Sequence, residues 1–401
     1  ANVGKTMHPL RKVSIKHKGP VYRLDLFNGD ITPISYQMTE DGVVVGLSFL
    51  EAESHLLVLG DAKLGKQSDK SQTWKPVSIP AADSQVLPVD GWNIHPLCEN
   101  SLVLDWCRYR IDGAKWSLPM PIWDAFTRIR QTYGFSTSRA NRDIQPWRQK
   151  QSRSPITSSE TIDIELSFNL HNVDECHQTV KLVVESGSDY IIDINGVQKP
   201  PYSGIWLDEA FATYDVTDFL KEGSNTVILS TTFNEFWELE NCFLLGHFLA
   251  IPTTIAVPAE VDFHLDKLSF GDWTKQGYPF FAGQMEYRTV FRWDGSDSSQ
   301  LTLQLDELMA SVAKVSLNGM DIGHIALPPY TMDLSQAIKK GENDLRVVVI
   351  NSLRNLLDPL HYQTKPPIAG PELFSDPTNW QDGYNLAAQG VQDIRLLKSP
   401  K

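Results

Sequence analysis

The chain reads YDVTDFLKEGSNTVIL at residues 214–229 and, with the same spacing, MDLSQAIKKGENDLRV at residues 332–347. In each copy the aspartate and the glycine are eight residues apart, as Asp215 and Gly223 are in the first, and an asparagine follows two positions later. Internal self-similarity of this kind constrains an architecture more than a single motif does. The sequence therefore predicts two copies of one structural element.

An Asn-Gly pair precedes each copy, as Asn195-Gly196 in the first and Asn318-Gly319 in the second. Both central residues of a two-residue hairpin turn need positive φ, which asparagine and glycine tolerate. Each pair lies between apolar residues, so we expect two equivalent β-hairpins.

The stretch after each hairpin predicts a single helical turn. The hydroxyl of Thr217 or Ser335 is expected to cap its start, and Gly223 or Gly341 to end it in the left-handed conformation. The chain then returns as a buried strand. A hairpin, one helical turn and a strand are typical of a jelly-roll β-sandwich and not of a parallel α/β fold.

The rest of the chain favours the same all-β class. Aromatic residues make up 10% of the sequence, and 24 Pro and 25 Gly suit short strands joined by tight turns. Further strands are expected at residues 21–26, 43–50, 55–59 and 102–111. One amphipathic helix is expected at residues 121–133, packed across a sandwich.

A chain of 401 residues exceeds one ordinary core and has room for two or three domains. We expect a partial β-sandwich at residues 1–86, a jelly-roll sandwich at 87–256 and a second jelly roll at 257–401.

Together these segments resemble the sugar-binding, galactose-binding-like jelly roll of family-2-type glycoside hydrolases and their large relatives. The resemblance covers about residues 100–401. It is carried by the two repeat copies and by residues 238–246, 271–273, 277–283 and 351–357.

This resemblance implies a non-catalytic, C-terminal part of a large hydrolase. In such relatives the sandwiches accompany a (β/α) barrel that carries the chemistry, and residues 1–86 resemble the small sandwich that follows the barrel. No barrel-like alternation of strands and helices is predicted within these 401 residues.

Carboxylate pairs are the groups that glycoside hydrolysis requires. Glu238 lies beside Trp237, and Glu372 lies near Trp380 in the sequence. A chain with 49 acidic residues produces such neighbours by chance. We therefore assign no catalytic residue, and keep Glu238 and Glu372 as the candidates to test.

Sugar binding needs an aromatic face for the apolar side of a pyranose and polar groups for its hydroxyls. His361, Tyr362, Trp380 and Tyr384 form the best such set, within a Pro- and Gly-rich excursion, and Trp237 belongs to a second set. These aromatic residues can instead close the ends of a sandwich, and both readings stay open.

Charge and motifs restrict the partners and cofactors. A formal charge of −13 opposes binding to nucleic acid or to an anionic membrane. The four cysteines lack CxxC spacing, and no GxSxG, HExxH, GxxxxGK[ST] or GxGxxG motif occurs, so no metal or cofactor is expected. The first residues lack the apolar core of a signal peptide, which leaves a cytoplasmic or a secreted location open.

The sequence thus predicts an accessory region that binds carbohydrate, or packs on its own catalytic domain, and frames the cleft of a glycoside hydrolase. Two other functions remain alternatives. One is a glycoside hydrolase with carboxylates at a domain seam, and the other is a surface adhesion or protein-interaction module.

Overall fold

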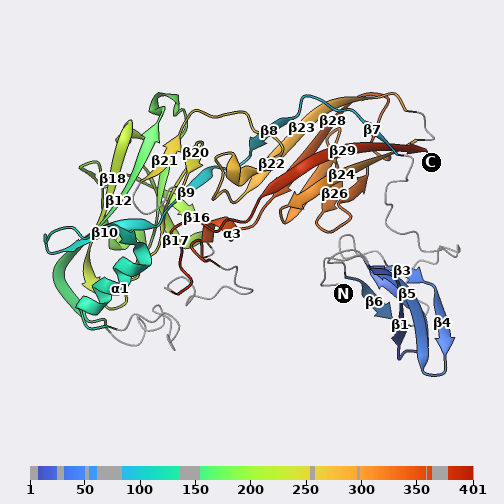
Figure 1. Ribbon diagram of the computed structural model, residues 1–401, viewed down its shortest axis with the longest axis horizontal. Helices are drawn as coiled ribbons and strands as arrows, with labels where there is room; N and C mark the ends of the chain where they lie inside the picture. Colours follow the sequence, from blue (N-terminus) through green and yellow to red (C-terminus); the bar gives the residue numbers. More distant parts are fainter. Residues whose placement is uncertain are drawn as a thin grey trace. The chain divides into compact units, whose positions relative to one another are not determined.

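The computed structural model describes residues 8–24, 31–49, 54–60, 84–135, 154–252, 258–295, 299–357, 359–363 and 378–400 (Figure 1). Strands dominate these residues, and the two α-helices among them are short. The predicted all-β class is confirmed, and strands occupy most of the described residues of the four predicted strand runs.

The chain divides into two compact units. Unit 1 comprises Ala1–Ile94, Glu286–Ile350 and Val391–Lys401, and unit 2 comprises His95–Met285 and Asn351–Gly390. The segment Asn351–Gly390, expected in the second jelly roll, belongs to unit 2. The three-domain boundaries at 86/87 and 256/257 stay a prediction.

The described part of unit 2 contains two main sheets. The first has the order β11-β10-β12-β18-β14-β15, with β21 paired in parallel to β12 and in antiparallel to β20. Its strands are β10 (Trp106–Ile111), β11 (Met120–Pro121), β12 (Thr157–His171), β14 (Ile191–Ile194), β15 (Val197–Gln198), β18 (Gly223–Asn234), β20 (Leu249–Ile251) and β21 (Ala259–Asp262). The second has the order β16-β17-β13-β19-β9. Its strands are β9 (Asn100–Leu104), β13 (Lys181–Glu185), β16 (Tyr202–Trp206), β17 (Asp208–Asp215) and β19 (Cys242–Gly246), and β22 (Gly271–Asp272) follows later in the unit.

One apolar core joins the two sheets of unit 2. β12 contributes Ile162, Ile164, Leu166 and Phe168, which alternate along the strand and are fully buried. Side chains of β13 and β19 belong to the same core. Because alternate side chains of a strand point to opposite faces, this pattern makes unit 2 a β-sandwich.

The described part of unit 1 contains four sheets. Two small ones have the orders β1-β5-β4 and β3-β2-β6 and share a core of Val21, Val43, Val45 and Leu47. Their strands are β1 (His8–Ile15), β2 (Val21–Leu24), β3 (Ile31–Ile34), β4 (Tyr36–Thr39), β5 (Gly42–Phe49) and β6 (Leu56–Leu59).

The other two sheets of unit 1 carry the second repeat copy. One has the order β29-β24-β27, with β7 paired to β29, and the other has the order β26-β25-β28-β23-β8. Their strands are β7 (Gln85–Leu87), β8 (Asn93–Pro96), β23 (Gln284–Trp293), β24 (Ser299–Met309), β25 (Val312–Leu317), β26 (Met320–Ile325), β27 (Thr331–Asp333), β28 (Gly341–Ile350) and β29 (Gly390–Pro400).

The predicted helix is confirmed as α1 (Ile122–Thr132). Its buried residues are Ile122, Ala125, Phe126 and Ile129, which recur at helical spacing on one face. Gly134 follows the helix with φ +77°, the left-handed conformation expected after a helix end. The same spacing leaves Trp123 on the flank of the buried face.

The two predicted hairpins are confirmed. Asn195 and Gly196 have φ values of 54° and 87°, and they join the antiparallel strands β14 and β15. Asn318 and Gly319 have φ values of 54° and 79°, and they join β25 and β26 in the same way. Neither copy forms a βαβ unit.

A buried asparagine closes the turn that follows the first hairpin. The side-chain oxygen of Asn225 accepts hydrogen bonds from the Lys221 backbone N–H (3.0 Å) and from Asn195 Nδ2 (2.8 Å). Its amide nitrogen donates to the carbonyls of Lys221 (2.7 Å) and Gly223 (2.9 Å). The fixed two-residue spacing from glycine to asparagine therefore reflects a turn folded around one amide.

The second copy repeats this arrangement. Asn343 Oδ1 accepts from the Lys339 N–H (3.0 Å) and from Asn318 Nδ2 (2.9 Å), and its Nδ2 donates to the carbonyls of Lys339 (2.8 Å) and Gly341 (2.9 Å). Both asparagines have no exposed surface. The local chemistry of the repeat is thus the same in both units.

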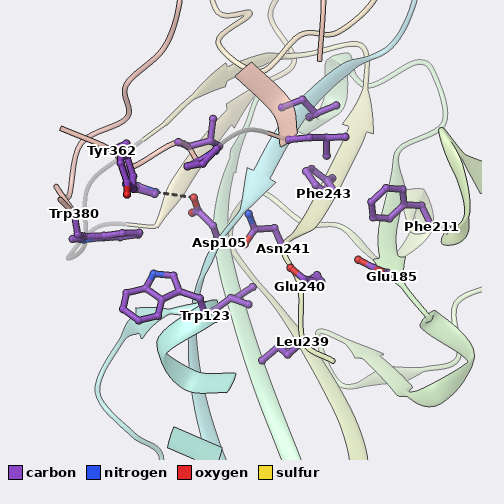
Figure 2. Close-up of a pocket in the computed structure, with 16 residues that line it drawn as sticks. Asp105, Trp123, Glu185, Phe211, Leu239, Glu240, Asn241, Phe243, Tyr362 and Trp380 are labelled. Atoms are coloured by element: carbon purple, nitrogen blue, oxygen red, sulfur yellow. Dashed lines mark hydrogen bonds and ion pairs between the residues drawn. The ribbon is translucent and has the colours of Figure 1, made fainter. Parts of the chain in front are cut away.

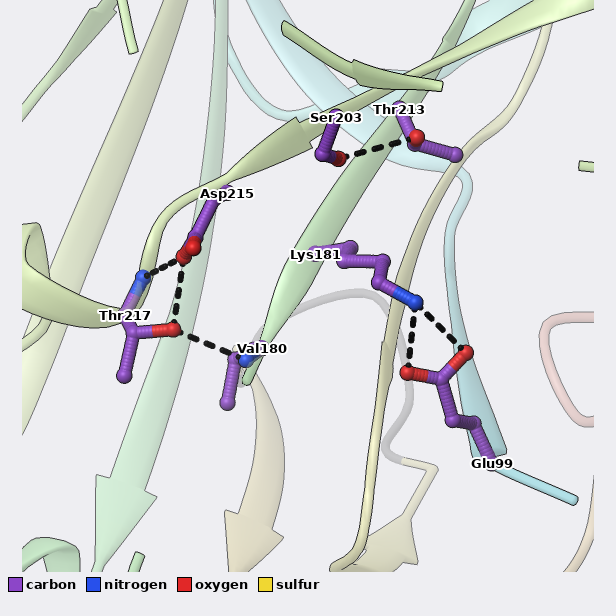
Figure 3. A network of polar contacts seen from close by, with 7 residues as sticks. All are labelled: Glu99, Val180, Lys181, Ser203, Thr213, Asp215 and Thr217. Carbon is purple, nitrogen blue, oxygen red and sulfur yellow. Dashed lines mark hydrogen bonds and ion pairs between the residues drawn. The ribbon is translucent and has the colours of Figure 1, made fainter. Parts of the chain in front are cut away.

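The expected caps at Thr217 and Ser335 are wrong. The Asp215 carboxylate accepts from the Thr217 N–H (3.1 Å) and hydroxyl (2.7 Å), and the hydroxyl oxygen accepts from the Val180 N–H (Figure 3). A preceding aspartate readily folds over the turn in this way, and the hydroxyl is then available to a neighbouring segment.

In the second copy, too, the aspartate and not the hydroxyl residue accepts the hydrogen bond at the start of the turn. Asp333 Oδ1 accepts from the Ser335 N–H (2.8 Å), and Ser335 Oγ accepts from the Leu301 N–H (3.0 Å). The aspartate of the repeat is therefore the residue that closes the start of the turn.

Replacing Gly223 with valine is expected to destabilise unit 2 by about 1 kcal/mol or more, because β-branched residues strongly disfavour positive φ. Gly223 has φ +78°, and a Cβ there would meet no heavy atom within 4 Å, so the cost is conformational. Gly383→Val is the matched control, since its site is equally open and its φ lies outside the left-handed region. Equal urea midpoints for the two variants would contradict a left-handed requirement.

Candidate functional site

A cavity of about 320 Å³ lies within unit 2 (Figure 2). Two tryptophans, three carboxyl side chains and one amide line it, together with apolar residues. The lining comprises Asp105, Ile122, Trp123, Glu185, Phe211, Leu239, Glu240, Asn241, Phe243, Leu356, Leu357, Pro359, Leu360, His361, Tyr362 and Trp380. We call this cavity the aromatic pocket.

Asp105 enters the pocket because it interrupts a strand. The sequence predicted one strand at residues 102–111, but β9 ends at Leu104 in the second sheet and β10 begins at Trp106 in the first. The prediction was wrong here, because strand propensity does not mark the point where a chain crosses between two sheets. Asp105 lies at that crossing and is 6% exposed.

The Asp105 carboxylate binds two side chains from the C-terminal part of unit 2. Its Oδ2 lies 2.9 Å from His361 Nε2, and its Oδ1 accepts from the Tyr384 hydroxyl at 2.9 Å. Burial, followed by the charge of Asp105, raises the pKa of Tyr384 far above its ordinary value. The phenol therefore stays protonated and remains a donor to Asp105.

Two short segments, 359–363 and 378–385, pair to present His361 and Trp380. The Gln381 N–H donates to the His361 carbonyl (2.8 Å), and the Gln363 N–H donates to the Asn379 carbonyl (2.8 Å). Tyr362 and Trp380 form an antiparallel bridge between them. The backbone therefore fixes both aromatic side chains at one wall of the pocket.

Trp123, His361 and Trp380 pack against one another along that wall. The rings of His361 and Trp380 stack with centroids 4.3 Å apart at 25°, and Trp380 meets Trp123 edge-on at 5.6 Å. Trp123 Nε1 has no hydrogen-bond partner in the described part of the chain. Helix α1 thus supplies one half of the aromatic wall, and the C-terminal segments supply the other.

The facing side of the pocket is acidic and apolar. Glu185 ends β13 and pairs with Phe211 of β17, while Glu240 and Asn241 precede β19. Figure 2 shows Glu185 and Phe211 across the pocket from the two tryptophans. Hydroxyl-accepting groups and aromatic faces therefore line one space.

The structure brings together most of the first predicted binding set. His361, Tyr362 and Trp380 line the pocket, and Tyr384 lies behind them, 4.5 Å from the His361 ring. Their assignment as carbohydrate contacts stays a prediction.

The remaining predicted residues lie elsewhere. Trp237 is 5% exposed and packs in the core against Phe126, with its Nε1 donating to the Tyr190 hydroxyl at 2.8 Å. Glu238 does not line the pocket, and its carbonyl accepts from Tyr190. Glu372 lies outside the described residues.

Sequence reasoning missed Asp105, Trp123, Glu185 and Asn241 as pocket residues. The helical spacing predicts Trp123 in the packing stripe of this helix, whereas the buried residues of α1 are Ile122, Ala125, Phe126 and Ile129 and do not include it. Asp105 had a usable signal, as a lone acid within an apolar strand pattern. The sequence around Glu185 and Asn241 has no feature that indicates a role in a pocket.

Within the described ranges, no group of three or more His, Cys, Asp or Glu side chains is placed to hold a metal ion. None of the helices in those ranges has the length and apolarity needed to cross a membrane.

Comparisons with known proteins give partial matches. No protein-family model matches the chain. Over 100 residues it is 31% identical to a protein from Formosa agariphila named putative beta-glucuronidase, a match that covers 23% of this chain and 8% of that protein. This local similarity supports a relationship with glycoside hydrolases.

Solved structures that resemble the chain are also named as glycoside hydrolases. A rhamnosidase from Novosphingobium sp. PP1Y is 19% identical, with 61% of this chain and 23% of that one covered and a TM-score of 0.24. A beta-D-mannosidase from Dictyoglomus thermophilum is 12% identical, with 65% and 32% covered and a TM-score of 0.23. A Ruminococcus gnavus beta-glucuronidase is 16% identical, with 37% and 22% covered and a TM-score of 0.21. The chain spans at most about a third of any of these three structures and less than a tenth of the curated relative.

Proposed function

We propose that the chain is an accessory, carbohydrate-binding region of a glycoside hydrolase, and that the aromatic pocket holds one sugar residue of a glycan. The observation that carries this proposal is the joint presence of Trp123, Trp380 and several hydroxyl-binding groups in one cavity. Its volume of about 320 Å³ is at the small end of ligand pockets, a size that suits a monosaccharide unit.

The lining chemistry favours a neutral sugar. An indole face can pack on the C–H surface of a pyranose, while Glu240 and Asn241 take hydrogen bonds from its hydroxyls. Three carboxyl groups line the pocket, and neither Arg nor Lys is among the lining residues. This charge disfavours uronate or sulfated sugars.

Replacing Trp380 with alanine is expected to weaken glycan binding about tenfold or more, because the pyranose loses its stacking face. Trp116→Ala is the matched control, since Trp116 is also half-buried in unit 2 but packs under Arg108 and Arg110, outside the pocket. A glycan array followed by calorimetry on the best ligand measures the effect. An equal loss of glycan affinity in Trp380→Ala and Trp116→Ala would contradict a sugar site in the aromatic pocket.

The adhesion alternative is tested by competition between a protein partner and glycan. A protein partner that binds the chain, and that excess glycan fails to displace, would favour an interaction module. Failure of every neutral glycan on the array would contradict the carbohydrate-binding role.

Hydrolysis is the second candidate function, and one observation favours it: Glu185 and Glu240 both line the pocket. We nevertheless expect no turnover of aryl glycosides by the chain between about pH 4 and about pH 8. The assay compares wild type with Glu240→Gln and with Glu238→Gln, whose site lies outside the pocket. Turnover abolished only by Glu240→Gln would replace the accessory role with a catalytic one.

A further inference from the structure

The aromatic pocket contains a buried acid–base pair, Asp105 and His361. His361 is 5% exposed and Asp105 6%, and they meet through Nε2 and Oδ2 at 2.9 Å. A buried ion pair contributes little stability by itself, because desolvation offsets its attraction, whereas loss of one partner is costly.

Hydrogen-bond partners fix the protons on the His361 ring. Nδ1 faces the Gln381 carbonyl at 3.1 Å, and a carbonyl oxygen only accepts, so Nδ1 carries a hydrogen. Nε2 faces the Asp105 carboxylate, which also accepts the Tyr384 hydroxyl. While Asp105 is ionised, both ring nitrogens face acceptors, and both positions are satisfied together when the ring is an imidazolium.

The imidazolium also faces the pocket wall. Its ring stacks on Trp380 at 4.3 Å, a geometry in which a cation attracts an indole face, and Trp106 meets it edge-on at 6.2 Å. Removal of the Nε2 proton would weaken this stacking and turn a nitrogen lone pair toward the Asp105 carboxylate. The proton on His361 Nε2 therefore strengthens the stacking contact that holds Trp380 in place.

We infer that Asp105 is the positioning residue of the aromatic pocket: it keeps His361 doubly protonated and thereby holds Trp380 in place, so that the pocket wall depends on one proton. The wall is complete while the proton is bound and loosens when the proton is removed. The consequence for sugar affinity rests on the proposed function, whereas the state of the wall does not.

The other charged groups near His361 define the controls. Tyr384 stays protonated because burial raises its pKa. Asp382 accepts from Trp380 Nε1 at 3.3 Å, and Glu185 and Glu240 lie across the pocket. Arg354 belongs to α3 (Arg354–Leu357), whose Leu356 and Leu357 line the same pocket.

The test compares the wild-type chain with Asp105→Asn by NMR from about pH 5 to about pH 9, a range that includes ordinary histidine titration. The asparagine oxygen can still accept from Tyr384, and its amide can donate to Nε2 of a neutral His361. This variant therefore keeps the contacts and removes the need for the second ring proton. Asp382→Asn, which changes the partner of Trp380 but not of His361, is the matched control.

We expect two ring protons on His361 in the wild type at about pH 6 and one in Asp105→Asn. The indole N–H resonance of Trp380, assigned with Trp380→Phe, should move with the His361 nitrogens in the wild type and in Asp382→Asn, but stay constant in Asp105→Asn. A singly protonated His361 in the wild type, a Trp380 resonance that does not titrate there, or the same titration in Asp105→Asn would overturn the inference.

Sugar affinity is the second readout. It should fall about tenfold or more from the low to the high end of the range in the wild type and change less than about threefold in Asp105→Asn. If no sugar binds at any pH while the resonances behave as stated, the proposed function fails and the positioning role stands. A wild-type affinity that stays constant while the resonances move would overturn the link between the wall and binding.

Discussion

Replacing Asn225 with alanine is expected to lower the free energy of unfolding of unit 2 by about 3 kcal/mol or more. The side chain is fully buried and makes four hydrogen bonds within 3.0 Å. Each buried polar group left without a partner costs about 1–3 kcal/mol, and the alanine strands the Lys221 N–H and two carbonyls together. Urea unfolding followed by circular dichroism measures the change.

Asn234→Ala provides the comparison within the same unit. The Asn234 side chain is half-buried, and its oxygen accepts from the Phe236 N–H at 2.8 Å. Loss of one such bond is expected to cost about 1 kcal/mol. Similar midpoints for Asn225→Ala and Asn234→Ala would show that the turn does not depend on its buried amide.

Two of the four thiols should be almost unreactive in the folded chain. Cys107 and Cys242 are 3% and 1% exposed, and burial, with a smaller effect of Glu185, raises the pKa of Cys242 to about 12. The thiolate is the reactive form, so both access and ionisation are suppressed. Labelling of these two thiols should be at least about a thousandfold slower than in the unfolded chain, as expected when reaction requires unfolding.

Cys98 and Cys176 are half-buried and serve as internal controls, since they should react in the folded protein. Because folding keeps the Cys242 thiol neutral, unit 2 should also lose stability as pH rises above the ordinary thiol pKa of 9.0 toward about 12. Equal labelling rates at all four cysteines under native conditions would contradict the packing around Cys107 and Cys242.

The sequence predicted those features that depend on neighbouring residues. Positive φ at Asn195-Gly196 and at Gly223 follows from the residues themselves, and so does the helix around Phe126. The caps were wrong because three polar side chains compete at that turn, and the spacing alone does not show that Asp215 closes it. Local chemistry thus determined the elements and left one choice of partner undetermined.

Only part of the pocket was predicted, because the pocket combines residues that are distant in the sequence. His361, Tyr362 and Trp380 were found because aromatic residues in a Pro- and Gly-rich stretch indicate a binding loop. Asp105, their main partner, lies 256 residues before His361 in the chain, and no local pattern connects such distant positions. Contacts of this kind come from the tertiary fold and not from periodicity.

The division of the chain into units limits which truncated or recombined products can keep the aromatic pocket. Unit 2 is not contiguous: the strands from Glu286 to Ile350 are an insertion between its two parts. A truncated product ending at Met285 would retain Asp105 and Trp123 but lack His361 and Trp380. Recombination or truncation can therefore transfer this pocket intact only when the inserted strands travel with it.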